Sequence, residues 1–334
     1  MIISRTPYRL SFFGGGTDYP EWFRERGGAV LATSINRYCY LTCRYLPPFF
    51  DHKFRIVYSQ TEDVQEISEI RHPVARAALE MFRFRNGLEI HHDGDLPARS
   101  GIGSSSAFTV GLLHALHALR GEMVSKRELA STAIRIERDV LKESVGCQDQ
   151  ITTAFGGFNF VEFLPSGEYR VEPVTIPVAQ VEEIESHCLL LFTGISRFSS
   201  EIAATYVQNL AAKERHLSKV QQSVSIGRKL LAEAGRMQEF GALLNETWQA
   251  KKALSDRVST PEVDEIYDQA ISAGALGGKL LGAGGGGFLL LFVPPASRRA
   301  VRQRLYKLLH VPIKFESGGS EVIYYEPEET EEPV

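Results

Sequence analysis

The order of apolar and polar residues along the chain predicts strands and helices separated by glycine-rich breaks. Residues Ile2–Phe13 alternate loosely between apolar and polar, as a strand does, and Ala29–Tyr45 is again rich in strand-forming residues. The run Gly14-Gly15-Gly16 separates the two stretches. The remaining predicted elements are a helix over Val74–Phe84, strands over Leu88–His92, Gly157–Phe163, Tyr169–Ile176 and Leu189–Thr193, several helices up to Gly274, a strand over Phe288–Val293, a helix over Ser297–His310 and two short final strands.

Two further helices follow the polar loop Asp93–Gly103. The first, Ser104–Leu119, carries apolar residues on nearly every side, so we expect it to be buried. The second starts at a capping box made by Ser125 and Glu128, and it is expected to run to about Ser144.

The length of the chain sets its domain organisation. With 334 residues it is long enough for two domains that each have a hydrophobic core. We expect the first domain to cover residues 1–180 and the second to cover residues 181–326. The acidic, proline-containing tail, residues 327–334, is expected to be disordered.

Charge and cysteine content exclude several classes of protein. A net charge of −4 gives no support to binding of nucleic acid or a membrane surface, so local groups must hold any negatively charged substrate. Residues Met1–Leu10 lack the apolar core of a signal peptide, and no apolar run is long enough to span a membrane. The cysteines are too few for a disulfide framework, and Cys39 with Cys43 on one face of a strand indicates packing rather than a zinc site. We therefore expect a cytoplasmic protein.

The segment Pro97–Phe108, called the cradle below, is the first candidate for chemistry. Its glycines let the backbone turn tightly and approach a ligand, and Ser104 is the expected N-cap of the following helix. The free amides of the first helical turn and the helix dipole then form an anion site suited to the phosphates of a nucleotide. The hydroxyls of Ser104 and Ser105 can add hydrogen bonds, or one can ligate Mg²⁺. A capped helix after a glycine-rich turn, without a ligand, is the alternative that this stretch alone leaves open.

Three better-known motifs do not fit this chain. A P-loop ending at Gly278-Lys279 would need glycine at Ala273 and serine or threonine at Leu280. The run Gly282–Gly287 fits a dinucleotide-binding pattern, but it leads into a predicted strand instead of a helix. A nucleophile elbow in the cradle would need glycine at Ala107.

Glu137 is a carboxylate on the apolar face of its helix. Its neighbours three and four residues away are all apolar, while the polar stripe of the helix runs elsewhere. A buried glutamate is costly unless it meets a cation or a hydrogen-bond partner. Two interpretations of Glu137 remain, a buried salt bridge to an arginine and a Mg²⁺ ligand beside the cradle.

Asp149 follows the end of that helix, next to a glycine turn. It could cap a helix over Gln150–Phe155, or it could act as a catalytic base. A base would have to reach the acceptor hydroxyl and a positive group that keeps the carboxyl ionised. Arg9 is the candidate for that positive group.

Taken together, these residues resemble the GHMP kinase family. The resemblance rests on three separated motifs in the right order, which are Thr6–Tyr19, the cradle segment Pro97–Ala107, and Gly277–Phe288. It implies an α+β fold of two domains, with an N-terminal ribosomal-protein-like α/β domain and a C-terminal ferredoxin-like α+β domain. It also implies an ATP-dependent phosphotransferase with an alcohol group as acceptor, acting as a monomer or homodimer.

The resemblance assigns roles to individual residues. Asp149 would be the catalytic base, and Arg9 would keep it ionised and steady the transferred phosphoryl group. Ser105 and Glu137 would ligate Mg²⁺. The residues that would bind the phosphates of ATP are Gly101, Gly103, Ser104, Ser105 and Ser106. The residues that would bind the substrate are Gly15, Gly16, Thr17, Asp18, Arg197, Gly284 and Gly285.

The first motif also narrows the substrate. Galactokinases have glutamate and histidine where this chain has Gly15 and Gly16, which argues against galactose. The variant Gly14–Asp18, with Thr193–Arg197 downstream, resembles D-glycero-D-manno-heptose 7-phosphate kinases, which phosphorylate the anomeric hydroxyl of a sugar phosphate. Arg197, with Arg24 and Arg37 behind it, is the candidate for holding the phosphate of such a sugar. A fucokinase-like enzyme, and a non-catalytic sensor of sugar and ATP, are the alternatives.

Overall fold

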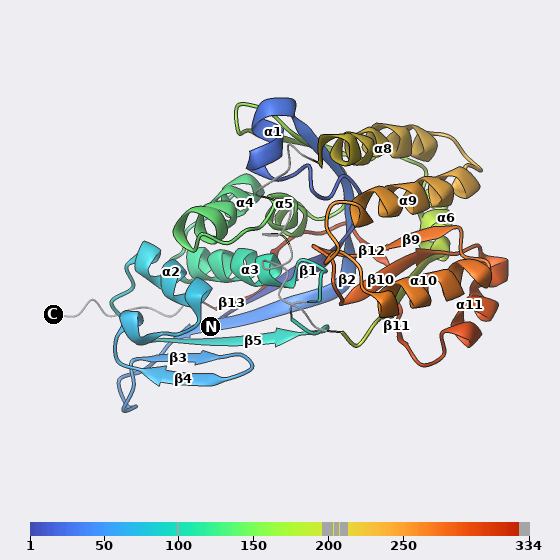
Figure 1. Cartoon of the computed structure of the whole chain (residues 1–334). Coiled ribbons are helices and arrows are strands. Elements are labelled where there is room, and N and C mark those ends of the chain that lie inside the picture. The colour runs from blue at the N-terminus through green and yellow to red at the C-terminus, as the bar shows by residue number, and fades with distance from the viewer. Residues whose placement is uncertain (99, 196–202, 204–206, 208–212, 327–334) are drawn as a thin grey trace.

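Two β-sheets form the framework of the molecule in its computed structural model, which describes residues 1–98, 100–195, 203, 207 and 213–326 (Figure 1). Over these residues the larger sheet contains β1 (Ile2–Phe13), β2 (Gly28–Tyr45), β3 (Phe54–Val57), β4 (Thr61–Val64), β5 (Leu88–Gly94), β6 (Phe158–Phe163), β7 (Tyr169–Pro173), β12 (Phe315–Glu316) and β13 (Glu321–Tyr325). The smaller, antiparallel sheet contains β8 (Cys188–Phe192), β9 (Gly277–Leu280), β10 (Phe288–Phe292) and β11 (Leu309–Val311), in the order β11-β8-β10-β9.

The long strand β2 holds the larger sheet together. It pairs antiparallel with β1, β5, β6 and β12, so segments from both ends of the chain meet on it. Its partner β1 is buried along almost its whole length, and the first candidate residue, Arg9, lies on it. Arg9 pairs with Ser34 of β2 in the antiparallel register.

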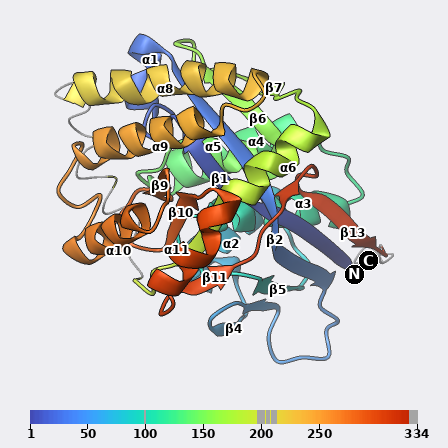
Figure 2. The ribbon, with the colours of Figure 1, turned by 90° about the vertical axis from the view of Figure 1, so that its right-hand side faces the viewer.

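The helices pack in two groups (Figures 1 and 2). Their bounds are α1 (Pro20–Arg26), α2 (Pro73–Phe82), α3 (Ser104–Leu119), α4 (Lys126–Ile134), α5 (Gln148–Phe155), α6 (Val178–His187), α8 (Glu214–Ala232), α9 (Met237–Lys252), α10 (Pro261–Ser272) and α11 (Arg298–Arg304). The helix α3 packs on β1 and β2 with α4 and α5 beside it, while α8 packs on α9 and α9 packs on β9. Within the described part of the chain, no helix combines the length and the apolar character needed to cross a membrane.

The path of the chain links the two sheets at its end. After β11 in the smaller sheet, β12 and β13 return to the larger sheet and pair with β2 and β1. Residue 181, the expected domain boundary, lies inside α6. The division into residues 1–180 and 181–326 stays a prediction, and the expected tail 327–334 lies outside the described residues.

Most predicted elements are confirmed, including the buried helix α3 and the capping box of α4. The hydroxyl of Ser125 accepts a hydrogen bond from the Glu128 amide at 3.2 Å, and the Ser125 amide donates to the Glu128 carboxylate at 2.9 Å. The predicted extent of this helix to Ser144 is wrong. The chain changes to a π-helical turn over Arg135–Val140, and Lys142 then adopts a φ of 57°, which no helix continues through.

Two other predicted details are also wrong. Ser104 is not the N-cap of α3, because Gly103, at a φ of 75°, takes that position and Ser104 is the first helical residue. The last helix ends at Arg304 instead of His310, because residues 309–311 pair with β8 as β11. Pairing with a neighbouring strand outweighs the local helical preference there.

Candidate active site

The cradle and the third motif meet backbone against backbone. A Cβ added at Gly101 would lie 2.4 Å from the carbonyl oxygen of Leu281, and one at Gly287 would lie 2.2 Å from that of Ser100. The Phe288 amide donates a hydrogen bond to the same Ser100 oxygen at 3.0 Å. Glycine is therefore required on both sides, because any side chain would push the two loops apart.

The first motif reaches the cradle through Arg9. Its amide donates to the carbonyl oxygen of Ile102 at 3.0 Å, and its Nη1 donates to that of Gly101 at 2.6 Å. The amides of the first turn of α3 begin directly after this contact, at Ser104. The three motifs thus converge at one helix N-terminus, where a nucleotide phosphate is favoured.

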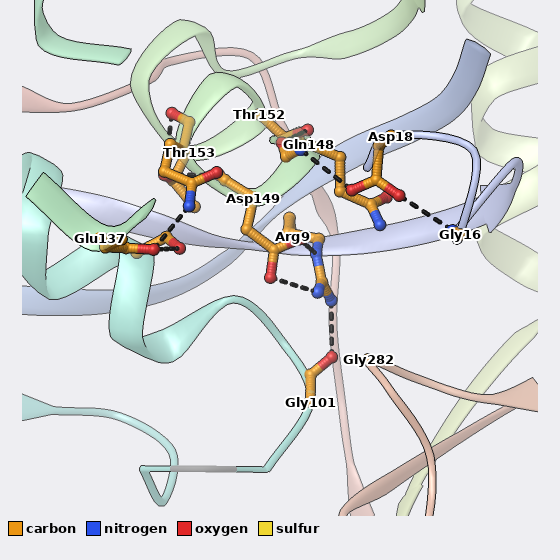
Figure 3. A network of polar contacts seen from close by, with 12 residues as sticks. Arg9, Gly16, Asp18, Gly101, Glu137, Gln148, Asp149, Thr152, Thr153 and Gly282 are labelled. Carbon is orange, nitrogen blue, oxygen red and sulfur yellow. Dashed lines mark hydrogen bonds and ion pairs between the residues drawn. The ribbon is translucent and has the colours of Figure 1, made fainter. Parts of the chain in front are cut away.

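Arg9 and Asp149 form a two-point ion pair at this place (Figure 3). Nε of Arg9 lies 2.8 Å from Oδ1 of Asp149, and Nη2 lies 2.6 Å from Oδ2. The side chain of Arg9 is 2% exposed and that of Asp149 is 26% exposed. The capping interpretation of Asp149 is wrong, because α5 starts at Gln148 with Cys147 as its N-cap. A two-point guanidinium contact stabilises the ionised carboxylate, which still has an open side for a hydroxyl group.

Asp18 and Thr17 make hydrogen bonds within the loop that follows β1 and to the elements beside it. The Asp18 carboxylate accepts hydrogen bonds from the amides of Gly16, at 2.9 Å, and Gln148, at 3.2 Å. Burial raises the pKa of Asp18. The hydroxyl of Thr17 donates to the carbonyl oxygens of Gly14 and Ala29, both at 2.9 Å. Asp18 thus fixes the loop against α5 and Thr17 fixes it against β2, and a direct contact of either with substrate stays a prediction.

Glu137 lies in the π-helical turn and is completely buried. Its carboxylate accepts hydrogen bonds from Ser106 at 3.0 Å, Thr109 at 2.6 Å and Gln150 at 2.5 Å. These neutral groups take the place of the arginine considered above, so the interpretation as a buried salt bridge is wrong. Burial raises the pKa of Glu137 to about 7, although the hydrogen bonds act in the opposite direction.

The surroundings of Glu137 fit a hard cation. Carboxylate and hydroxyl oxygens are the protein ligands that Mg²⁺ takes, usually few of them beside water and substrate phosphates. Among the described residues no cluster of three or more histidine, cysteine, aspartate or glutamate side chains could hold a metal by itself. The serine hydroxyl that donates to Glu137 belongs to Ser106, not to Ser105. Ser105 is exposed at the start of α3. Ser105 and Glu137 as the metal pair stay a prediction.

Two buried lysines beside the ion pair were missed at the level of sequence. Nζ of Lys251, on α9, donates to the carbonyl oxygen of Gly282, and Nζ of Lys279, on β9, donates to that of Phe12 at 3.2 Å. Burial lowers the pKa of Lys251 to about 8, and it lowers that of Lys279 well below its ordinary value. Lys251 follows the buried Leu244 and Trp248 on one helix face, by the same spacing that singled out Glu137.

The other predicted substrate residues make contacts of their own or cannot be placed. Gly284 and Gly285 pack on Val258, whose carbonyl oxygen accepts a hydrogen bond from the Gly285 amide at 3.0 Å. Arg37 donates to the carbonyl oxygens of Asn36 and Pro312. Arg197 lies outside the described residues.

Arg24 lines a cavity of about 470 Å³ between α1, α4 and the turn after β6. Neither Arg9, Asp149 nor Glu137 lines this cavity, so it is separate from the ion pair.

Comparison with known proteins decides the family. The pattern of the GHMP kinases N terminal domain matches residues 71–157, and that of the GHMP kinases C terminal domain matches residues 228–310. A D-glycero-alpha-D-manno-heptose 7-phosphate kinase from Campylobacter jejuni is 30% identical over 92% of this chain and 93% of its own length. The chain belongs to the GHMP kinase family. It is an ATP-dependent phosphotransferase that acts on a sugar.

Two further comparisons agree with this family. The crystal structure of a D-glycero-D-manno-heptose 1-phosphate kinase from Bacteroides thetaiotaomicron has a TM-score of 0.78 at 27% identity, covering 97% of this chain and 99% of that one. An L-fucokinase/L-fucose-1-P guanylyltransferase from Bacteroides fragilis is 27% identical over 85% of this chain, which spans only 34% of that protein. The predicted two-domain fold of mixed helices and sheets is confirmed.

Proposed function

We propose that this GHMP kinase transfers the γ-phosphoryl group of ATP to the anomeric hydroxyl of D-glycero-D-manno-heptose 7-phosphate. The product would be the 1,7-bisphosphate, an intermediate toward nucleotide-activated heptose. The similarity to the Campylobacter jejuni relative over nearly its whole length supports this sugar, as does the glycine pair Gly15-Gly16. The observation that carries the reaction is the Arg9–Asp149 ion pair at the N-terminus of α3.

Each group of residues would have its own role in the phosphoryl transfer. The amides at the start of α3, with Ser104 and Ser105, would hold the phosphates of ATP. Asp149 would accept the proton of the sugar hydroxyl while the hydroxyl oxygen forms its bond to the γ-phosphorus and ADP leaves in line. Arg9 would keep the carboxylate ionised and offset negative charge on the transferred group.

A magnesium ion fits the oxygen ligands beside the cradle, with Glu137 and Ser105 as its proposed protein ligands. When bound it supplies charge neutralisation at the phosphates. The buried Glu137, ringed by hydroxyl groups and an amide, supports this assignment.

A substrate panel tests the proposal. Purified protein with ATP and Mg²⁺ is offered heptose 7-phosphate, fucose, galactose and mannose, and ADP release is measured with each. We expect the highest kcat/KM with heptose 7-phosphate, and phosphorus NMR should place the new phosphate on the anomeric carbon. A clear preference for fucose would support the fucokinase alternative instead. Binding of sugar and ATP without ADP release would support a sensor.

A further inference from the structure

Three polar side chains converge on a residue that has no side chain of its own. The three atoms nearest to a Cβ added at Gly15 are Nε2 of Gln148 at 3.5 Å, Nζ of Lys251 at 3.9 Å and Oγ of Ser11 at 3.9 Å. Gly15 is buried, yet a methyl group there would meet no atom closer than ordinary contact distance. A small space lined by an ammonium, an amide and a hydroxyl group therefore lies over Gly15.

These three side chains do not use their full hydrogen-bonding capacity within the described part of the chain. Oγ of Ser11 and Oε1 of Gln148 are buried without a hydrogen-bond partner in the part of the chain that the structure describes. Across the same residues, Nζ of Lys251 has one hydrogen bond, to Gly282, although an ammonium group offers three donors. Buried polar groups are nearly always satisfied in folded proteins, so a convergent unsatisfied set indicates a polar ligand.

The position of the set identifies which substrate it faces. Gln148 and Asp149 are neighbours at the start of α5, and in Figure 3 Gln148 lies on the Asp18 side of the ion pair, opposite Glu137. Lys251 lies within electrostatic reach of Arg9, Asp18 and Asp149, and of Lys279 on the adjacent β9. The set is thus on the acceptor side of the base, away from the carboxylate assigned to the metal and nucleotide.

We infer that Lys251, Gln148 and Ser11 bind the hydroxyl groups of the acceptor sugar next to the one that is phosphorylated, and so determine which sugar fits. Sugar hydroxyls both donate and accept, which matches an ammonium donor, an amide with both functions and a serine hydroxyl. Gly15 leaves the room that this part of the sugar occupies. The inference rests on the proposed function in that Asp149 is the base and the acceptor is a sugar.

The test separates acceptor binding from nucleotide binding. The variants Lys251→Met, Gln148→Leu and Ser11→Ala are assayed for KM of the acceptor and KM of ATP, using the sugar that the wild type phosphorylates fastest. Loss of a hydrogen bond to a charged group should raise the acceptor KM about tenfold to a hundredfold in Lys251→Met, and less in the other two. The KM of ATP should stay within about twofold of wild type in all three. Lys252→Met is the matched control, because Lys252 pairs with Asp264 at 3.0 Å and should leave both constants unchanged.

Gly15→Ala gives a second, independent readout. Its methyl group fits the folded protein but enters the space assigned to the sugar, so the melting temperature should hold while the acceptor KM rises at least tenfold. An unchanged acceptor KM in both Lys251→Met and Gly15→Ala would overturn the inference, and so would a rise confined to the KM of ATP. A wild type that phosphorylates no sugar would instead overturn the proposed function.

Discussion

Arg9 and Asp149 are separated by 140 residues, yet two hydrogen bonds of 2.8 and 2.6 Å join their side chains. The side chain of Arg9, on β1, is buried under the cradle, and the side chain of Asp149 is partly exposed. A buried guanidinium that has no carboxylate beside it is unfavourable, so each residue requires the other. The pair therefore links the core of the larger sheet to the N-terminus of α5.

Asp149→Asn should abolish most of the activity and also lower the melting temperature, because the buried Arg9 loses its ionised partner. The amide keeps the shape of the carboxylate but cannot accept the sugar proton, so we expect kcat to fall about a hundredfold to ten-thousandfold. The KM of ATP should change little, because the cradle amides are untouched. Steady-state ADP release measures both constants. Asp268→Asn, at an exposed position on α10, is the control and should behave as wild type.

Glu137→Gln tests the metal assignment. If the carboxylate holds Mg²⁺, the Mg²⁺ concentration for half-maximal activity should rise at least about tenfold, since a neutral amide is a poorer ligand for a hard cation. The fold should survive, because glutamine is uncharged and removes the desolvation of a buried carboxylate. Titration of activity with Mg²⁺ at fixed ATP, with circular dichroism in parallel, gives the answer. An unchanged Mg²⁺ dependence would show that Glu137 has only a structural role.

Comparing Gly101→Ala with Gly121→Ala should separate the effect of a steric clash from that of backbone strain at a positive φ. Gly101 has a φ of 84°, and its added Cβ would lie 2.4 Å from the Leu281 carbonyl oxygen. Gly121 has a φ of 67° with nothing within 4 Å, so Gly121→Ala suffers backbone strain alone and is the matched control. We expect Gly121→Ala to lose about 1 kcal/mol of stability and keep its KM of ATP.

Gly101→Ala should lose about 2–4 kcal/mol, because the clash adds to the strain, and it should raise the KM of ATP as the cradle moves. Thermal unfolding and ATP saturation curves measure the two effects. Equal stability losses in the two variants would contradict the close approach of the two loops.

The sequence singles out a candidate residue wherever that residue breaks the pattern around it. Glu137 could be identified because a carboxylate stands among apolar neighbours, and the cradle because its glycines precede a helix. The partners of Glu137 could not be predicted, since Ser106, Thr109 and Gln150 come from two helices whose packing is a long-range property. Ser104 failed as N-cap because Gly103 can adopt a positive φ that the sequence leaves undecided.

Lys251 is a buried lysine that the spacing of apolar residues on its helix indicates. The adjacent Lys252 makes the pair resemble the basic end of an exposed helix, where lysines favour the helix dipole. Only the spacing from Leu244 and Trp248 places Lys251 on the buried face. That it lies beside Arg9 and Gly15 follows from the packing of α9, which no local pattern encodes.

Lys251 should make sugar binding depend on pH and should reduce stability near neutral pH. Burial lowers its pKa from 10.5 to about 8, and the charges of Arg9, Asp18 and Asp149 also act on it. The ammonium is present below pH 8, so the acceptor KM should be constant there and rise as the pH passes 8. In Lys251→Met this rise should be absent, while the KM of ATP follows the same pH profile in both proteins.

The charge of Lys251 should lower the free energy of unfolding, whereas a residue that serves the structure would raise it. Because the folded state binds this proton more weakly than the unfolded state, the charged lysine destabilises the fold fully below pH 8, and the penalty fades between pH 8 and 10.5. The penalty is on the order of 3 kcal/mol, and loss of the hydrogen bond to Gly282 offsets about 1 kcal/mol of it. Lys251→Met should therefore melt a few degrees higher than wild type at pH 7, and the difference should shrink toward pH 10. A lower melting temperature at pH 7 would mean that Lys251 stabilises the fold, and that its charge serves the folded structure instead of the sugar.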